Sequence, residues 1–131
     1  MNSREQELLV LSQQLLDSIA AGDWSTYEQL CDPTLSAFEA EARGHLVEGL
    51  DFHRFYFQGN GGGSPVRKLN TITSPHVRLL GNDAAVVSYV RLIQRQTADG
   101  AFTTDCCEET RVWQKIGGGW RHVHFHRSGN R

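Results

Sequence analysis

The sequence has few cysteines and no excess of basic charge. Its three cysteines are Cys31, Cys106 and Cys107; two are adjacent, and no C-x-x-C pair occurs. A small, odd count suits a reducing compartment better than a disulfide framework, so we expect a cytoplasmic protein. Lysine and arginine total 13 against 15 aspartates and glutamates, a net charge of -2. Proteins that bind nucleic acid or anionic membranes normally carry a basic excess, so we expect neither partner.

Long apolar runs are also missing. No apolar stretch is longer than Ala84–Val87, far short of the ~20 residues that a membrane-spanning helix needs. Apart from Met1 the first seven residues are polar, so we expect no targeting segment. The sequence contains no phosphate loop, nucleophile elbow or dinucleotide fingerprint, so we expect no cofactor.

What remains is the composition of one small globular domain. The chain has 131 residues, of which 39% are hydrophobic and 21% charged, so we predict a single domain over residues 1–131. Apolar residues at helical spacing predict helices over 3–21, 23–30 and 46–57, with a short extended piece over 35–43. Ser3 and Gln6 have the spacing of a capping box at the first helix. Gly59–Pro65 is glycine-rich and predicts a flexible loop.

The second half of the chain alternates with period two. We predict strands over 66–80, 84–98, 101–116 and 119–127, joined by glycine-containing hairpin turns. Helices followed by an antiparallel meander indicate an α+β fold, with the helices packed on one face of the sheet.

Strand alternation also predicts which side chains share a face. Arg91 falls in phase with Tyr89, Arg111 with Glu109, and Arg127 with Phe125. If the helices cover these faces, three guanidinium groups converge in a partly enclosed pocket. Glu109 can neutralise one of them, and the remaining positive charge suits a carboxylate or phosphate ligand. The alternative is that each arginine reaches solvent at a strand end or pairs with a local acid such as Glu108.

Three other groups of residues receive structural interpretations. His122, His124 and His126 share the opposite face of the last strand under strict alternation, but no neighbouring acid or cysteine completes a zinc site, so we expect no metal. Glu39 and Glu41 are expected to be solvated or interfacial charges. The tryptophans Trp24, Trp113 and Trp120 are expected to anchor the core or an interface.

Several longer segments carry a resemblance that covers nearly the whole chain. They are Cys31–Pro33, Ala37–Glu39, Leu46–Gly49, Asp51–Phe57, Ser74–Val77, Tyr89–Leu92, Glu108–Trp113 and Val123–Gly129. In order and spacing they resemble the association (hub) domain of calcium/calmodulin-dependent protein kinase II, a member of the nuclear transport factor 2-like superfamily.

This resemblance implies both a fold and a function. The fold would be a cone-shaped α+β barrel, with a long N-terminal helix on a curved antiparallel sheet. Subunits would pair and assemble into two stacked rings, commonly of twelve or fourteen copies, that gather the kinase domains of a calmodulin-binding parent protein. The resemblance further implies a pocket for small carboxylates or acidic peptide segments, lined by His53, Arg91, Arg111 and Arg127. The hub itself would not be an enzyme.

The chain also departs from the usual pattern of that family. No kinase domain or calmodulin-binding segment lies in these 131 residues, so the chain is either an excised hub or a free-standing homologue. The glycine-rich stretch at Gly59–Pro65 and the Cys106-Cys107 pair suggest a divergent member whose ring size differs. The alternative function is that of a dimeric small-molecule-binding protein or an isomerase- or dehydratase-like enzyme, with His53 as the base and Tyr56, Tyr89 or an arginine as the donor.

Overall fold

The computed structural model describes residues 1–59 and 67–131, so most of the glycine-rich stretch lies outside the described residues. The helices are α1 (Ser3–Ala21), α2 (Trp24–Leu30), the single-turn η1 (Ala40–Ala42) and α3 (Asp51–Gly59). The strands are β1 (Cys31–Phe38), β2 (Val47–Glu48), β3 (Arg67–Leu80), β4 (Ala84–Gln96), β5 (Phe102–Ile116) and β6 (Gly119–Arg127). Among the described residues, no helix has the length and apolar character needed to cross a membrane.

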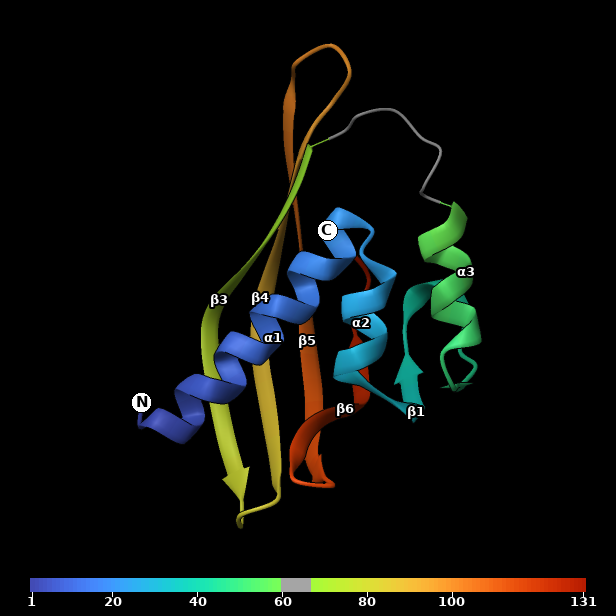
Figure 1. Ribbon diagram of the computed structural model, residues 1–131. Helices are drawn as coiled ribbons and strands as arrows, with labels where there is room; N and C mark the ends of the chain where they lie inside the picture. The colour runs from blue at the N-terminus through green and yellow to red at the C-terminus, as the bar shows by residue number, and fades with distance from the viewer. Residues whose placement is uncertain (60–66) are drawn as a thin grey trace.

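The strands form one six-stranded sheet in the order β2-β1-β6-β5-β4-β3. The meander from β3 to β6 is antiparallel, as the sequence predicts, whereas β1 joins the edge of β6 in a parallel pairing that period-two patterning does not reveal. Figure 1 shows α1 running diagonally over one face of the sheet, with α2 beside it over the central strands and α3 near the β1 side. The α+β plan is therefore confirmed.

The core fills the space between α1 and the sheet. Leu8, Leu15 and Leu16 on α1 are completely buried, and they pack in one cluster with Val87 and Trp113 of the sheet. The Trp113 indole donates to Ser12 Oγ on α1 (3.2 Å), which satisfies a buried polar pair at this contact. Trp113 is thus a core anchor, as the sequence analysis expects.

The N-terminus of α1 is capped one residue earlier than predicted. Asn2 occupies the cap position: its side chain accepts from the Glu5 N–H (2.9 Å), and Glu5 Oε1 accepts from the Asn2 N–H (3.1 Å). This reciprocal arrangement is a capping box formed by Asn2 and Glu5 rather than by Ser3 and Gln6. The prediction was wrong because both pairs have the required three-residue spacing.

Two elements near β1 also differ from the prediction: the extended piece expected over 35–43 is the end of strand β1 followed by the single turn η1, and the third helix starts later than expected. The third helix begins at Asp51 rather than at residue 46, since Gly49 adopts a left-handed backbone (φ 81°) and its N–H bonds the Leu35 carbonyl (2.7 Å). A residue fixed in that conformation cannot continue a helix. Pro33 lies inside β1, at a point where the pairing with β6 shifts register between Cys31 and Ser36, so its missing N–H breaks no ladder bond.

A register shift in β6 changes which histidine faces the core. Trp113 pairs with His122 and Val112 with His124, so Val123 is the extra residue of a bulge. His122 is therefore completely buried on the same side as Phe125, and the prediction that it shares a face with His124 and His126 was wrong. Strict alternation fails here because the extra residue Val123 moves the residues that precede it in β6 to the opposite face of the sheet.

Candidate functional site

A cavity of about 220 Å³ opens where the C-terminal end of α1 meets the sheet. Ile19 and Ala20 of α1 and the rings of Tyr27 on α2 and Phe57 on α3 form part of its wall. The four residues that the resemblance implies as a pocket also line this cavity, although they come from α3, β4, β5 and β6: His53, Arg91, Arg111 and Arg127. The structure thus brings all four together.

One buried carboxylate organises the floor of the cavity. Glu109 is 2% exposed; its Oε2 accepts from Arg91 Nη1 (2.8 Å), and its Oε1 accepts from Arg111 Nη2 (3.0 Å). The Tyr89 hydroxyl donates to Glu109 Oε1 (2.6 Å) and accepts from Arg111 Nε (2.8 Å). Burial alone would raise the pKa of Glu109, but Arg111 and Arg91 outweigh it and hold the pKa at about 2. Glu109 is therefore ionised at neutral pH and neutralises one of two arginines.

Arg111 also contacts Phe125 and His122, and strand alternation alone had placed His122 on the other face. Its guanidinium stacks on the Phe125 ring, 4.4 Å from the ring centroid, and its Nη1 lies 3.4 Å from His122 Nε2. A guanidinium can only donate, so His122 Nε2 is the acceptor and its proton resides on Nδ1, 3.5 Å from Cys31 Sγ. Burial and the Arg111 charge lower the pKa of His122, which stays neutral.

The other two arginines are anchored by groups outside the Glu109 cluster. Arg91 Nε donates to Asn70 Oδ1 (3.1 Å), and the Asn70 amide in turn donates to the Leu16 carbonyl near the end of α1 (3.1 Å). Arg127 pairs with Glu41 and donates from Nη1 to Asn130 Oδ1 (3.2 Å). Each guanidinium thus has a fixed position before any ligand arrives, which lowers the ordering cost of binding.

His53 and Glu39 form a second titratable pair at the cavity wall. His53 Nδ1 lies 3.6 Å from Glu39 Oε1, while its Nε2 is buried and has no hydrogen-bond partner among the described residues. Burial and the Arg111 charge lower the pKa of His53 to about 4. Burial and the neighbouring Glu41 carboxylate raise the pKa of Glu39 to about 7. At neutral pH, His53 is uncharged and Glu39 is only partly ionised.

Several residues of this site were not predicted from the sequence. Glu39 and Glu41 line the cavity instead of being simply solvated or interfacial. They lie in the irregular segment around η1, where no periodicity assigns a face to a side chain. Lys68 and Asn70 on β3 and Arg95 on β4 line it as well. Alternation from Arg91 could have found Arg95, since residues four apart on a strand share a face.

Comparison with known proteins now decides the family. Residues 4–131 match the family described as the calcium/calmodulin dependent protein kinase II association domain. The chain belongs to this family. An association, or hub, domain implies self-association into oligomers, so the coarser part of the predicted function is confirmed.

Similar proteins come from animals, algae and bacteria. The calcium/calmodulin-dependent protein kinase type II alpha chain of Drosophila melanogaster is 49% identical over 128 residues, covering 97% of this chain and 24% of that protein. The hub domain thus spans about a quarter of the length of the curated relatives it matches. The hub homology domain of Chlamydomonas reinhardtii is 53% identical, with a TM-score of 0.89 and coverage of 96% and 98% of the two chains.

The wider fold is also confirmed. A nuclear transport factor 2-like protein from Salmonella enterica has a TM-score of 0.78 at 24% identity, covering 95% of this hub and 89% of that chain. Identity this low shows the fold alone. The hub therefore has the nuclear transport factor 2-like fold that the sequence predicts.

Proposed function

We propose that this hub is an oligomerisation scaffold whose subunits pair and then close into two stacked rings of twelve or more copies. In a parent chain that carries a kinase domain and a calmodulin-binding segment, such a ring would gather the kinase domains in the cytoplasm. Tethering raises the effective concentration of each kinase domain around its neighbours, so phosphorylation between subunits needs no new contact between them. Membership of the association-domain family supports this proposal.

The observation that carries the scaffold proposal is an uncovered apolar sheet face. On the side of the sheet away from α1, β4 presents Val86, Val90 and Leu92, and β5 presents Cys106 and Val112. All five side chains are partly exposed, and the ladder places Val86 beside Val112 and Leu92 beside Cys106. Figure 1 shows α1 and α2 only on the opposite face. Ser88, Thr110 and Glu108 lie among these apolar residues on the same face. A partly apolar sheet face that no helix covers favours burial against a second copy.

Native mass spectrometry of the purified hub tests the scaffold. We expect even multiples of the subunit mass at twelve copies or more. Val112→Asp should reduce the assembly to smaller species, because a buried, unpaired carboxylate is costly at an interface. Val10→Asp is the matched control: Val10 is 52% exposed on α1, far from this sheet face, and the variant should still form rings.

Two outcomes would contradict the scaffold. Wild-type hub that stops at a dimer overturns the rings and favours the alternative of a free-standing binding protein or isomerase-like enzyme. In that case Glu39, whose pKa of about 7 suits a general acid or base, is the first group to test for turnover. Rings that survive Val112→Asp would show that the sheet face is not the contact.

We also propose that the cavity accepts small carboxylates or acidic peptide segments. The three arginines Arg91, Arg111 and Arg127 line it, and the unpartnered Nε2 of His53 can donate to a bound carboxylate. Arg127→Gln should weaken butyrate binding by about tenfold, the loss typical of one charge-assisted contact. Calorimetry measures this loss. Arg78→Gln removes an equal charge from an exposed position on β3 and should leave the affinity unchanged. Equal affinities for all three proteins would refute the pocket assignment.

A further inference from the structure

Two cations at one end of the cavity have no counterion among the described residues. Lys68 on β3 and Arg95 on β4 pair directly across the ladder, and both side chains line the cavity. Neither takes part in an ion pair within residues 1–59 and 67–131. Arg95 Nε is buried and has no hydrogen-bond partner within the same residues. Like charges opposite each other on a sheet are destabilising, and so is a buried donor without an acceptor.

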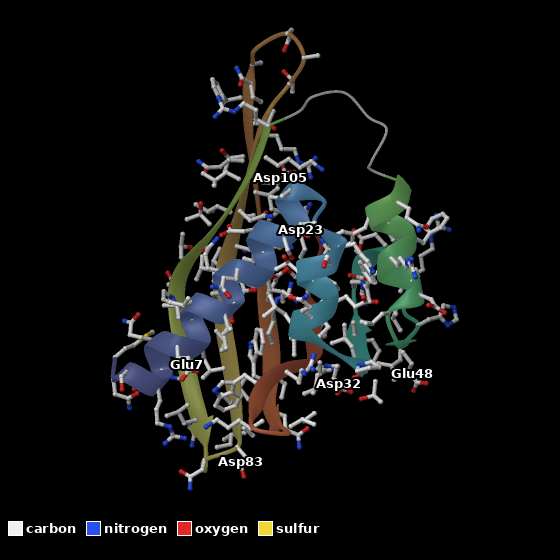
Figure 2. All side chains as sticks on the ribbon, in the orientation of Figure 1. Glu7, Asp23, Asp32, Glu48, Asp83 and Asp105 are labelled. Atoms are coloured by element: carbon white, nitrogen blue, oxygen red, sulfur yellow. The ribbon has the colours of Figure 1, made fainter. Side chains whose placement is uncertain are left out.

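One acid on the same face of the sheet, Asp105, does not neutralise either cation. Asp105 on β5 pairs across the ladder with Ile93, which lies two residues before Arg95 on β4 and faces the same side. Asp105 forms no ion pair with Lys68 or Arg95. Figure 2 shows Asp105 on the stretch of sheet beyond the C-terminal end of α1. This stretch therefore presents positive charge to the cavity that the hub itself leaves uncompensated.

The charges around the whole cavity favour a ligand with two negative charges. Five cationic side chains line the cavity: Lys68, Arg91, Arg95, Arg111 and Arg127. Glu109 and Glu41 offset two of them, and Glu39, with a pKa of about 7, offsets only part of a third at neutral pH. Between two and three positive charges remain, which exceeds what one carboxylate neutralises.

The excess charge is divided between two places rather than gathered at one point. Arg91 and Arg95 are four residues apart on β4, about 13 Å between Cα atoms at the usual rise per residue. Arg91 lies in the deep cluster around Glu109, whereas Arg95 and Lys68 lie at the end of the strands beyond α1. A compact dianion such as inorganic phosphate would reach only one of these groups, while a linear molecule with an anion at each end would reach both.

We propose that Lys68 and Arg95 form a second anion subsite and that the hub cavity takes a linear dicarboxylate. One carboxylate binds at the deep end, near Arg91, Arg111 and Arg127, and the other bridges Lys68 and Arg95. This proposal rests on the proposed carboxylate pocket and adds a ligand class to it. The second carboxylate supplies the acceptor that Arg95 Nε lacks and separates the two like charges.

Calorimetry with matched pairs of acids tests this subsite. The intact hub is titrated with α,ω-dicarboxylates from succinate to suberate and with the monocarboxylate of equal chain length in each case, so that the apolar contribution cancels. We expect at least one dicarboxylate to bind tenfold or more tightly than its partner, and inorganic phosphate to bind more weakly than that dicarboxylate. In the double variant Lys68→Gln/Arg95→Gln the preference should fall to about one, because the dicarboxylate loses more affinity than the monocarboxylate.

Arg67→Gln is the matched control, because Arg67 precedes Lys68 on β3 and alternation places it on the other face of the sheet. It should retain the full preference. If no dicarboxylate binds more tightly than its monocarboxylate, or if the double variant keeps the preference, the second subsite is overturned while the deep pocket stands. If no acid of either kind binds, both the subsite and the pocket fail. Phosphate binding more tightly than every dicarboxylate would also overturn the proposal.

Discussion

Glu109 is the residue on which the arrangement of the cavity depends most. It lies beside Glu108, so one strand offers two adjacent glutamates in opposite environments. Glu109 faces the cavity floor at 2% exposure and binds two arginines and a tyrosine. Glu108 faces solvent and pairs with Arg131 at 2.5 and 2.6 Å. The substitution Glu109→Gln keeps the shape of the side chain, removes its charge and replaces one of its two acceptor oxygens with an amide donor.

The structure sets the size of the expected effect. Without the Glu109 charge, the fully buried guanidinium of Arg111 has no counterion and keeps neutral partners: the amide oxygen of the new side chain, the Tyr89 hydroxyl, the His122 nitrogen and the Phe125 ring. Removing one partner of a buried ion pair typically costs ~3–5 kcal/mol, because an uncompensated charge stays behind. The remaining polar contacts place the expected loss of unfolding free energy near the lower limit, at about 3 kcal/mol. Glu108→Gln should cost far less, because water and salt screen an exposed pair.

Urea denaturation at fixed protein concentration measures both losses. Concentration must be held constant because self-association adds to the apparent stability of a subunit. A second series in the Val112→Asp background, which we expect to form smaller species, separates the effect on the cavity from the effect on the assembly. If Glu109→Gln and Glu108→Gln lose the same free energy in both backgrounds, the reasoning that the buried carboxylate compensates two arginines is refuted.

Two further predictions follow from the shifted pKa values and from the exposed sheet face. The pKa of Glu39 is raised from 4.5 to about 7 in the folded state, so the folded hub binds more protons between these values and its stability falls as pH rises through that window. Glu39→Gln should therefore gain stability relative to wild type from pH 5 to pH 8 in urea titrations, and a constant difference would contradict the shift. Among the cysteines, Cys106 should react with iodoacetamide in Val112→Asp but be protected in wild-type rings, while Cys31, buried and with a pKa of about 12, should stay unmodified in both. Mass spectrometry reads both labels, and equal labelling of Cys106 in the two proteins would count against the sheet-face contact.

The regular parts of the fold could be predicted because their patterns are local. Alternation along β4 and β5 identified the inward positions correctly, since the ladder between these strands runs without a register shift from Ala84 to Gln96. The parallel pairing of β1 with β6 could not be predicted in the same way. It joins residues 88 positions apart, such as Ser36 and His124, and period two says nothing about which edge receives a strand.

Among the residues that line the cavity, three arginines were predicted from the sequence but Glu39 and Glu41 were not, and the reason is structural. Arg91, Arg111 and Arg127 lie on regular strand segments; Arg127 remains in phase because it follows the bulge at Val123, whereas His122 precedes the bulge and was placed on the wrong face. Glu39 and Glu41 lie where the backbone leaves β1, turns through η1 and reaches a left-handed residue at Arg43. No repeat of two or 3.6 residues applies across such a segment.

This asymmetry biases any estimate of the charge in the cavity. Counting only the three arginines predicted from the sequence against Glu109 gives an excess of two positive charges, but this count omits Glu41 on Arg127 and the partial charge of Glu39. It equally omits Lys68 and Arg95, which restore the excess at the other end of the cavity. The total therefore changes little while its location changes greatly. For a ligand, the location decides more than the total, because two separated charges select a long anion over a compact one of equal charge.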